Sequence, residues 1–255
     1  MDPLLNFQGQ VALITGAADG FGRLLADALA YRGCKLVLSD INEEKLAQTV
    51  KDLREASADV VSMAGDIAKE STSEALVRLA LESYGQIDIA VNNAGIAHEP
   101  GALHTMDEAT IDQQLGVNLK GVLFGMKHQI PAMIANGKGH VLNVSSMAGL
   151  GGAPKAAPYA AAKHGVTGIT KTAAVEYGRK NVRVNAICPF FSPTNLLNLG
   201  GFTSEESRAQ LAIGSPMKRM ADPQEVVNTM VLMLSPGNSF MNGQAIALDG
   251  GMSAW

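Results

Sequence analysis

The chain has 255 residues, of which 47% are hydrophobic and 17% charged, and its formal net charge is −4. The high apolar content and small net charge exclude intrinsic disorder. The acidic balance also argues against nucleic-acid binding, which needs a cationic surface.

Two cysteines cannot form a disulfide framework, and both Cys34 and Cys188 adjoin apolar runs. We expect two buried thiols, with a reactive thiol or a metal ligand as the alternative. The five histidines are scattered without ligand spacing, so we expect no metal. No run approaches the ~18 apolar residues of a membrane span, and residues 1–6 do not resemble a signal peptide. A cytoplasmic protein with no membrane or nucleic-acid partner is expected.

Short β-branched runs alternate with longer segments of helical spacing along the chain. This alternation predicts an α/β domain whose parallel sheet is doubly wound, with helices on both faces. A helix start is predicted at Asp222, an N-cap candidate followed by Pro. Strands are expected at Val11–Thr15, Lys35–Ser39, Val60–Met63, Ile87–Asn92, His140–Ser145, Val182–Ile187 and Ala245–Leu248.

One long connection, at about 190–220, interrupts the alternation. Long connections in compact domains are often functional lids. There is no linker, low-complexity segment or repeat that would divide the chain. Residues 1–255 are therefore expected to form a single domain with one substrate-loop insertion.

The first predicted strand leads into a Gly-rich turn with the sequence Thr15-Gly16-Ala17-Ala18-Asp19-Gly20-Phe21-Gly22, and a helix follows. Glycines permit a sharp turn and close approach of a ligand, and the N–H groups at a helix start favour an anion such as a pyrophosphate. A turn without a ligand is the alternative. The strand–turn–helix context favours a dinucleotide.

Asp40 ends the second predicted strand, 18 residues after Gly22. An acid near this offset accepts hydrogen bonds from an adenosine ribose. Its carboxylate would repel a 2′-phosphate, and neither 16–21 nor 40–44 contains Arg or Lys, so NAD is favoured over NADP. The alternative role of Asp40 is an N-cap for the helix from Asn42, and both roles are compatible.

Tyr159 and Lys163 are four residues apart in a predicted helix and therefore share one face. A nearby ammonium lowers the pKa of a tyrosine, which then serves as a general acid/base. By itself the pair is more often an exposed helix face. However, Ser146 closes a predicted strand 13 residues before Tyr159, and ligands of open α/β sheets bind beyond the carboxyl ends of strands.

These motifs together resemble the short-chain dehydrogenase/reductase family, in family order, from Gly9 to Gly251. The resemblance implies one Rossmann-type domain with a seven-stranded parallel sheet, and usually a homotetramer. It implies a catalytic tetrad in which Tyr159 is the general acid/base and Lys163 lowers its pKa and holds the nicotinamide ribose. Ser146 would bind the substrate oxygen, with Ser145 structural, and Asn118 would support a proton relay. The tetrad is Asn118, Ser146, Tyr159 and Lys163.

The expected cofactor site extends from the turn along the ends of the later strands. One departure from the family concerns the residue after the sixth strand, where Pro189-Phe190 replaces the usual Pro-Gly. Phe190 is expected either to fill space near the nicotinamide or to force a different loop path. The expected cofactor-binding residues are Thr15, Gly16, Asp19, Gly20, Phe21, Gly22, Asp40, Ile41, Asp66, Ile67, Asn92, Ala94, Gly95, Tyr159, Lys163, Pro189 and Thr194.

The insertion is rich in apolar residues, which predicts an apolar pocket under a lid. The alternative is that these residues only pack the lid down. His98 and His104 follow Asn92-Asn93-Ala94-Gly95, but loop histidines are usually solvated. The expected substrate pocket is lined by Ser146, Ala148, Ala153, Tyr159, Phe190, Phe191, Leu196 and Leu197.

We therefore expect an NAD(H)-dependent oxidoreductase that interconverts an apolar secondary alcohol and a ketone by hydride transfer. The first alternative is an NADP-dependent 3-oxoacyl-carrier-protein reductase, which Asp19 and Asp40 disfavour because it needs a basic ribose pocket. The second is a non-catalytic dinucleotide-binding scaffold, which the intact tetrad disfavours.

Overall fold

A seven-stranded, all-parallel sheet forms the centre of the computed structural model, which describes residues 2–254. Its strand order is β3-β2-β1-β4-β5-β6-β7, so the doubly wound α/β prediction is confirmed. The strands start or end within two residues of the predicted positions. They are β1 (Val11–Thr15), β2 (Lys35–Asp40), β3 (Val60–Ala64), β4 (Ile89–Asn92), β5 (Gly139–Val144), β6 (Val182–Pro189) and β7 (Ala245–Leu248).

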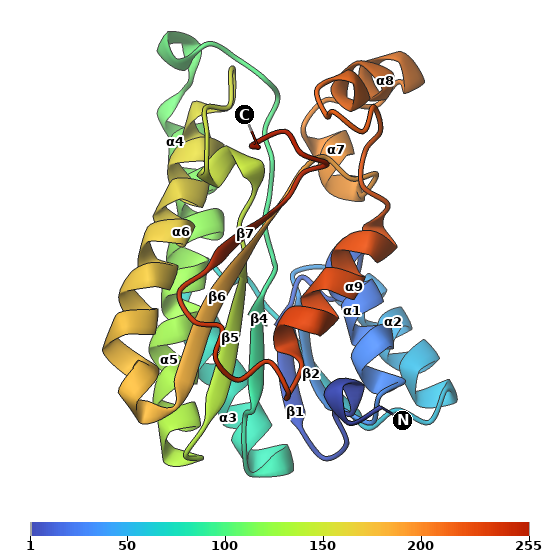
Figure 1. The fold of residues 1–255 in the computed structure, drawn as a ribbon, viewed down its shortest axis with the longest axis vertical. Helices are drawn as coiled ribbons and strands as arrows, with labels where there is room; N and C mark the ends of the chain where they lie inside the picture. The colour runs from blue at the N-terminus through green and yellow to red at the C-terminus, as the bar shows by residue number, and fades with distance from the viewer. Residues whose placement is uncertain (1, 255) are drawn as a thin grey trace.

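Helices cover both faces of the sheet (Figure 1). Side chains of successive strand residues point to opposite faces, so β1 contributes Ala12 and Ile14 to one hydrophobic core and Val11 and Leu13 to the other. This explains why all of β1 is buried. One face carries α1 (Gly20–Ala30), α2 (Glu43–Glu55) and α9 (Pro223–Leu234); the other carries α3 (Glu70–Tyr84), α5 (Gly121–Ala135) and α6 (Ala157–Tyr177).

The strand order reverses at β1, which pairs with β2 on one side and β4 on the other. Connections from β1 and β4 therefore leave in opposite directions, and a crevice forms at the carboxyl edge of the sheet.

Cys34 and Cys188 are buried free thiols, as predicted. Among residues 2–254, no helix has both the length and the hydropathy to cross a membrane.

Local capping sets where the helices begin. Asp222 and Glu225 form a capping box at the start of α9, which confirms the predicted helix start. The cap of α2 is Asn42, whose side chain accepts a hydrogen bond from the Lys45 N–H. The suggestion that Asp40 caps this helix was wrong, because Asn42 is one residue before the first helical turn.

The long connection after β6 forms two short helices, α7 (Asn195–Leu199) and α8 (Glu205–Ile213), rather than an open loop. They lie beyond the carboxyl ends of the strands (Figure 1). A Cβ on Gly20 would lie 3.5 Å from Thr194, so the insertion starts against the Gly-rich turn. The insertion therefore borders the candidate site.

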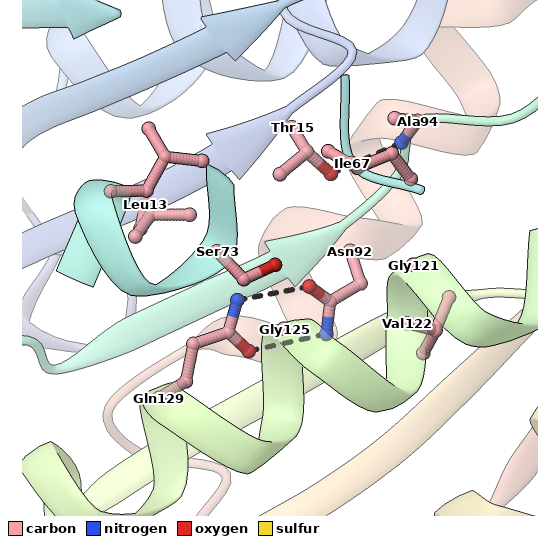
Figure 2. Close-up of a pocket in the computed structure, with 11 residues that line it drawn as sticks. Leu13, Thr15, Ile67, Ser73, Asn92, Ala94, Gly121, Val122, Gly125 and Gln129 are labelled. Carbon is pink, nitrogen blue, oxygen red and sulfur yellow. Dashed lines mark hydrogen bonds between the residues drawn. The ribbon is translucent and has the colours of Figure 1, made fainter. Parts of the chain in front are cut away.

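A buried polar network lies below this edge (Figure 2). The carboxamides of Asn92 and Gln129 hydrogen-bond each other at 3.2 and 2.9 Å, and Asn92 also donates to Asn143 at 2.9 Å. Asn143 donates to Thr170 on α6 at 2.9 Å.

The remaining elements are α4 (Glu108–Leu115), the π-helical turn Gly116–Lys120, and the short 3-10 segments Pro3–Leu5, Leu103–Thr105, Met147–Gly149 and Gly178–Lys180.

Candidate active site

The Gly-rich turn connects β1 to α1 with two glycines in the left-handed region, Gly16 at φ 66° and Gly20 at φ 53°. A Cβ on Gly22 would lie only 2.0 Å from the Gly16 carbonyl oxygen. The turn is therefore so tight that only glycine fits at position 22. The first N–H groups of a helix lack intrahelical acceptors, so the start of α1 presents donors beside a close backbone, which fits a dinucleotide pyrophosphate.

Asn93 fastens this turn to the segment after β4. Its Nδ2 donates to the carbonyls of Thr15 at 2.9 Å and Gly16 at 3.0 Å. Thr15 Oγ1 accepts from the N–H groups of Asn93 and Ala94, each at 3.2 Å, and Figure 2 draws the bond to Ala94. Sequence reasoning assigned no role to Asn93.

The side chain of Asn92, an expected cofactor residue, is directed into the buried network instead. It is 4% exposed and bonds Gln129 and Asn143. The reason is strand alternation: Asn92 is the last residue of β4, and the next side chain points the other way. Two successive asparagines in the sequence could have indicated that one of them binds the Gly-rich turn. Only the direction of each side chain at the end of β4 shows that Asn93 does so.

Asp40 lies beside the Gly-rich turn, as its offset predicts. Its Oδ2 accepts from the Ala18 N–H at 3.0 Å, and its Oδ1 accepts from the Asn42 N–H at 2.9 Å. A carboxylate oxygen has more than one acceptor position, so Asp40 retains capacity for ribose hydroxyls. The next residue, Ile41, is 73% exposed.

Asp66 lies two residues after the end of β3, and a backbone hydrogen bond of the preceding residue brings it near Asp40. The Gly65 N–H donates to the Asp40 carbonyl at 2.9 Å. Asp66 itself accepts from the Ala68 N–H at 2.9 Å and turns the chain toward α3. Ile67 is buried, and a Cβ on Gly121 would lie 2.3 Å from its side chain. Asp66 and Ile67, two of the expected cofactor-binding residues, therefore lie beside Asp40 at the carboxyl edge of the sheet.

Lys45 also reaches this edge. Its Nζ lies 3.1 Å from Asp19 Oδ2. The sequence argument counted cations only up to residue 44, so it missed this lysine by one position. The edge of the crevice beside Asp40 therefore contains the ammonium of Lys45, whose charge the Asp19 carboxylate offsets.

Ser146, Tyr159 and Lys163 meet at the carboxyl edge of β5. Ser146 lies just after β5, and its Oγ accepts a hydrogen bond from the Ala148 N–H at 3.1 Å. The Ser146 hydroxyl is near enough to Tyr159 to lower the pKa of its phenol. Tyr159 and Lys163 are one turn apart on α6, with Nζ 5.6 Å from the ring centroid. Nζ donates to the Val144 carbonyl at 2.8 Å. Three of the four expected tetrad residues therefore converge directly.

Burial controls the ionisation of this group. It raises the pKa of Tyr159 above its usual value, and this effect outweighs the opposite influence of the nearby Ser146 hydroxyl. Burial also lowers the pKa of Lys163 to about 8. The net direction is therefore opposite to the lowering expected from Lys163, because desolvation of the phenol is the largest effect on its pKa.

Asn118, the fourth tetrad residue, is fully buried in the π-helical turn Gly116–Lys120. Its Oδ1 accepts from the Ile96 N–H at 3.0 Å, and its Nδ2 donates to the Ile96 carbonyl and to Gln114 Oε1, each at 2.9 Å. Single π turns are frequent at functional sites. Asn118 thus holds the loop after β4 against α4, with the help of Gln114, which sequence reasoning missed.

Gly95 lies between Asn118 and Lys163. A Cβ on this residue would lie 2.8 Å from Asn118 Oδ1 and 3.7 Å from Lys163 Nζ. Ser145 Oγ donates to the Lys163 carbonyl at 3.0 Å, a contact that fits the structural role predicted for it.

The insertion carries a cluster of three aromatic rings. Phe190 is buried, packs edge-on against Phe191 with centroids 5.0 Å apart, and Phe191 packs against Phe202 at 5.9 Å. A Cβ on Gly214 would lie 3.6 Å from the Phe190 ring, so this ring fills space under the end of α8. Leu197 is buried beside it in α7, and Leu196 is half-buried.

The other expected pocket residues lie on neighbouring loops. Ala148 follows Ser146, and Ala153 belongs to a loop that joins the one after β4 through the Gly101 N–H, which donates to the Lys155 carbonyl at 2.9 Å. His98 Nδ1 lies 2.8 Å from the Glu99 carbonyl, and His104 is exposed. Across residues 2–254, no three His, Cys, Asp or Glu side chains cluster as a metal site would require.

Known proteins match the chain over nearly its full length. A family model described as "Enoyl-(Acyl carrier protein) reductase" matches residues 16–253. The cyclohexanol dehydrogenase of Acinetobacter sp. (strain SE19) is 35% identical over 248 residues, which cover 96% of this chain and 95% of that protein.

Two solved structures show the same fold. The crystal structure of levodione reductase is similar with a TM-score of 0.93 at 34% identity, covering 98% of this chain and 99% of that one. The crystal structure of 3-ketoacyl-(acyl-carrier-protein) reductase from Brucella melitensis complexed with NADH has a TM-score of 0.90 at 33% identity, covering 97% and 100%.

Gly22→Ala tests the closure of the Gly-rich turn. A Cβ would meet the Gly16 carbonyl at 2.0 Å, so we expect a loss of stability of about 3 kcal/mol or more and loss of NADH binding. Urea unfolding and NADH fluorescence measure the two effects. The control is Gly168→Ala on α6, where a Cβ meets nothing within 4 Å. An alanine at position 22 that unfolds and binds like wild type would contradict the close contact.

Lys163→Met tests the pKa of Lys163. The folded-state pKa of about 8 lies below the usual 10.5, so the cost of burying the ammonium is full below pH 8. It is relieved toward pH 10.5, because the folded protein loses this proton before the unfolded chain does. We expect wild type to gain up to about 3 kcal/mol relative to Lys163→Met between about pH 7 and about pH 10.

Urea unfolding of both proteins at the two pH values measures this difference. Lys171→Met, an exposed lysine of the same helix, is the control and should show no such trend. A wild-type advantage that stays constant or shrinks as the pH rises would contradict a depressed Lys163 pKa.

Proposed function

The chain belongs to the short-chain dehydrogenase/reductase family, and on this premise we propose that it is an NAD(H)-dependent enzyme that interconverts an apolar secondary alcohol and its ketone. As a member of this family it is an oxidoreductase that uses a nicotinamide dinucleotide. The observation that carries the proposal is the convergence of Ser146, Tyr159 and Lys163 at the carboxyl edge of the sheet, with Lys163 Nζ 5.6 Å from the centroid of the Tyr159 ring.

Tyr159 is the proposed proton donor and acceptor. When bound, the nicotinamide ring supplies or accepts a hydride at the substrate carbon. In ketone reduction the phenol of Tyr159 gives its proton to the substrate oxygen, and in alcohol oxidation it takes that proton back. Because burial raises its pKa, Tyr159 holds this proton at neutral pH, which suits the direction of ketone reduction.

Ser146 orients the reacting oxygen in this proposal. Its hydroxyl oxygen is held by the Ala148 N–H, so the group is already oriented to hydrogen-bond a substrate carbonyl. Lys163, with a pKa of about 8, exchanges a proton near neutral pH more readily than an exposed lysine. We propose that it restores the proton that Tyr159 gives up.

NAD is the proposed cofactor because two carboxylates, Asp40 and Asp19, face the edge where the adenosine ribose would bind. A 2′-phosphate would be repelled by both. The Brucella relative whose structure holds NADH is compatible with this choice but does not decide it for this chain.

The proposed substrate is a small ring alcohol. The aromatic cluster of Phe190, Phe191 and Phe202 supplies an apolar surface in the insertion that borders the site, and the Acinetobacter relative is a cyclohexanol dehydrogenase. A 3-oxoacyl-carrier-protein reductase is the second candidate, since the Brucella relative carries that name. A non-catalytic scaffold is disfavoured because all four tetrad residues are present.

Tyr159→Phe tests the proposed reaction. Wild type should reduce NAD in the presence of cyclohexanol, read as NADH absorbance, and Tyr159→Phe should lose about a thousandfold in kcat because the acid/base group is gone. NADH binding by fluorescence should change little. Tyr177→Phe, at the end of the same helix, is the matched control and should turn over normally.

Three results would count against the proposal. Retained turnover in Tyr159→Phe would remove it as the acid/base. Activity only with a β-ketoacyl thioester would favour the carrier-protein reductase. No turnover across a panel of secondary alcohols and ketones would favour the scaffold.

We also propose a homotetramer in the cytoplasm, on the family resemblance. Several large apolar side chains, including Leu232 and Phe240, are exposed on the single chain, and assembly would cover them. Multi-angle light scattering should give four times the chain mass. A monomer at micromolar concentration would refute the assembly.

A further inference from the structure

An exposed ion pair closes the edge of the crevice next to Asp40. Lys45 Nζ lies 3.1 Å from Asp19 Oδ2, and the two side chains are 54% and 51% exposed. The other oxygen of Asp19 accepts from the Gly20 N–H at 2.7 Å. One carboxylate therefore caps α1 and binds the lysine at the same time. We call Asp19, Asp40 and Lys45 the ribose edge.

Asp40 anchors both partners of this pair. The Ala18 N–H, next to Asp19 in the chain, donates to one oxygen of Asp40, and the Asn42 N–H donates to the other. Asn42 in turn accepts from the Lys45 N–H at 2.9 Å. The backbones of Asp19 and Lys45 are thus each tied to the same carboxylate through a neighbouring residue, which makes their approach a consequence of the fold.

The charge of the ribose edge depends on this pair. Asp19 and Asp40 contribute two negative charges and Lys45 one positive charge, so the edge is net negative. The nearby Arg23 does not alter this balance, because it pairs with Asp27 at 3.1 Å and Asp52 at 3.0 Å. Without the charge of Asp19 the edge would be neutral and the ammonium of Lys45 would have no acid partner.

We propose that Asp19 is a specificity-determining residue that acts through Lys45. By pairing with this lysine, Asp19 keeps it from binding the 2′-phosphate of NADP(H). The inference rests on the proposed nicotinamide cofactor and deepens it: two carboxylates, and not Asp40 alone, discriminate against the phosphorylated nucleotide. In this proposal Lys45 is a cation that could bind a phosphate but is held by Asp19 instead.

Asp19→Asn tests this directly, because asparagine keeps the helix cap while removing the charge. The measurement is equilibrium binding of NADH and NADPH, followed by nucleotide fluorescence in the absence of any second substrate. We expect the ratio of the NADPH Kd to the NADH Kd to fall about fivefold to tenfold in Asp19→Asn. The gain should shrink at about 0.5 M salt, since both charges are exposed.

The double variant Asp19→Asn/Lys45→Met isolates the lysine. It has the same charge as wild type, and we expect its Kd ratio to return most of the way to the wild-type value. A double variant that binds NADPH as tightly as Asp19→Asn would show that Lys45 has no part in the effect and would overturn the mechanism.

Glu55→Gln is the matched control for net charge. Glu55 pairs with Lys51 on the same helix, at 4.0 Å and with both side chains 66% exposed. Its removal also frees one lysine of α2, but away from the ribose edge. We expect no change in the Kd ratio, and a change equal to that of Asp19→Asn would reduce the effect to overall charge and overturn the inference.

The wild-type measurement separates this inference from the function on which it rests. Wild type that binds neither nucleotide, or binds NADPH more tightly, overturns both the proposed cofactor and the role of Asp19. Wild type that prefers NADH, combined with an unchanged ratio in Asp19→Asn, overturns the role of Asp19 alone.

Discussion

The approach of Gly22 to the Gly16 carbonyl is the contact on which the site depends. It lets α1 begin directly at the end of β1, so that the first N–H groups of the helix point into the crevice where β1 and β4 diverge. Asn93 then ties the segment after β4 to the same turn. A methyl group at position 22 would separate these parts. Because the turn carries the two sides of the crevice, its compactness sets the position of everything that follows each strand.

The catalytic group is held in place at a cost to stability. Lys163 and Asn118 are buried, and their polar atoms are bonded to the backbone of Val144 and Ile96 rather than to water. Burial alone moves the pKa of Lys163 to about 8. A hydrophobic side chain would pack there without this penalty, so a buried ammonium fits the chemical role proposed for Lys163 better than a contribution to folding.

The two electrostatic tasks of the site are performed in different surroundings. Lys163 is buried and Tyr159 is half-buried, so burial shifts the pKa values of both groups, and salt has little effect on Lys163. Asp19, Asp40 and Lys45 lie at the exposed edge, where each charge counts for less and salt screens it. In the proposed function, proton transfer would thus depend on exclusion of water, whereas cofactor choice would depend on a balance of solvated charges.

The sequence by itself determined the features that depend on neighbouring residues: the seven strands, the cap at Asp222, the Gly-rich turn and the helical spacing of Tyr159 and Lys163. Hydrophobic periodicity, capping and turn chemistry act within a few residues and can be read along the chain. Only the tertiary structure decided which of Asn92 and Asn93 braces the turn, that Lys45 reaches Asp19 across 26 positions, and that burial raises the pKa of Tyr159. These depend on strand register, on contacts between distant segments and on desolvation, which exist only once the chain has packed.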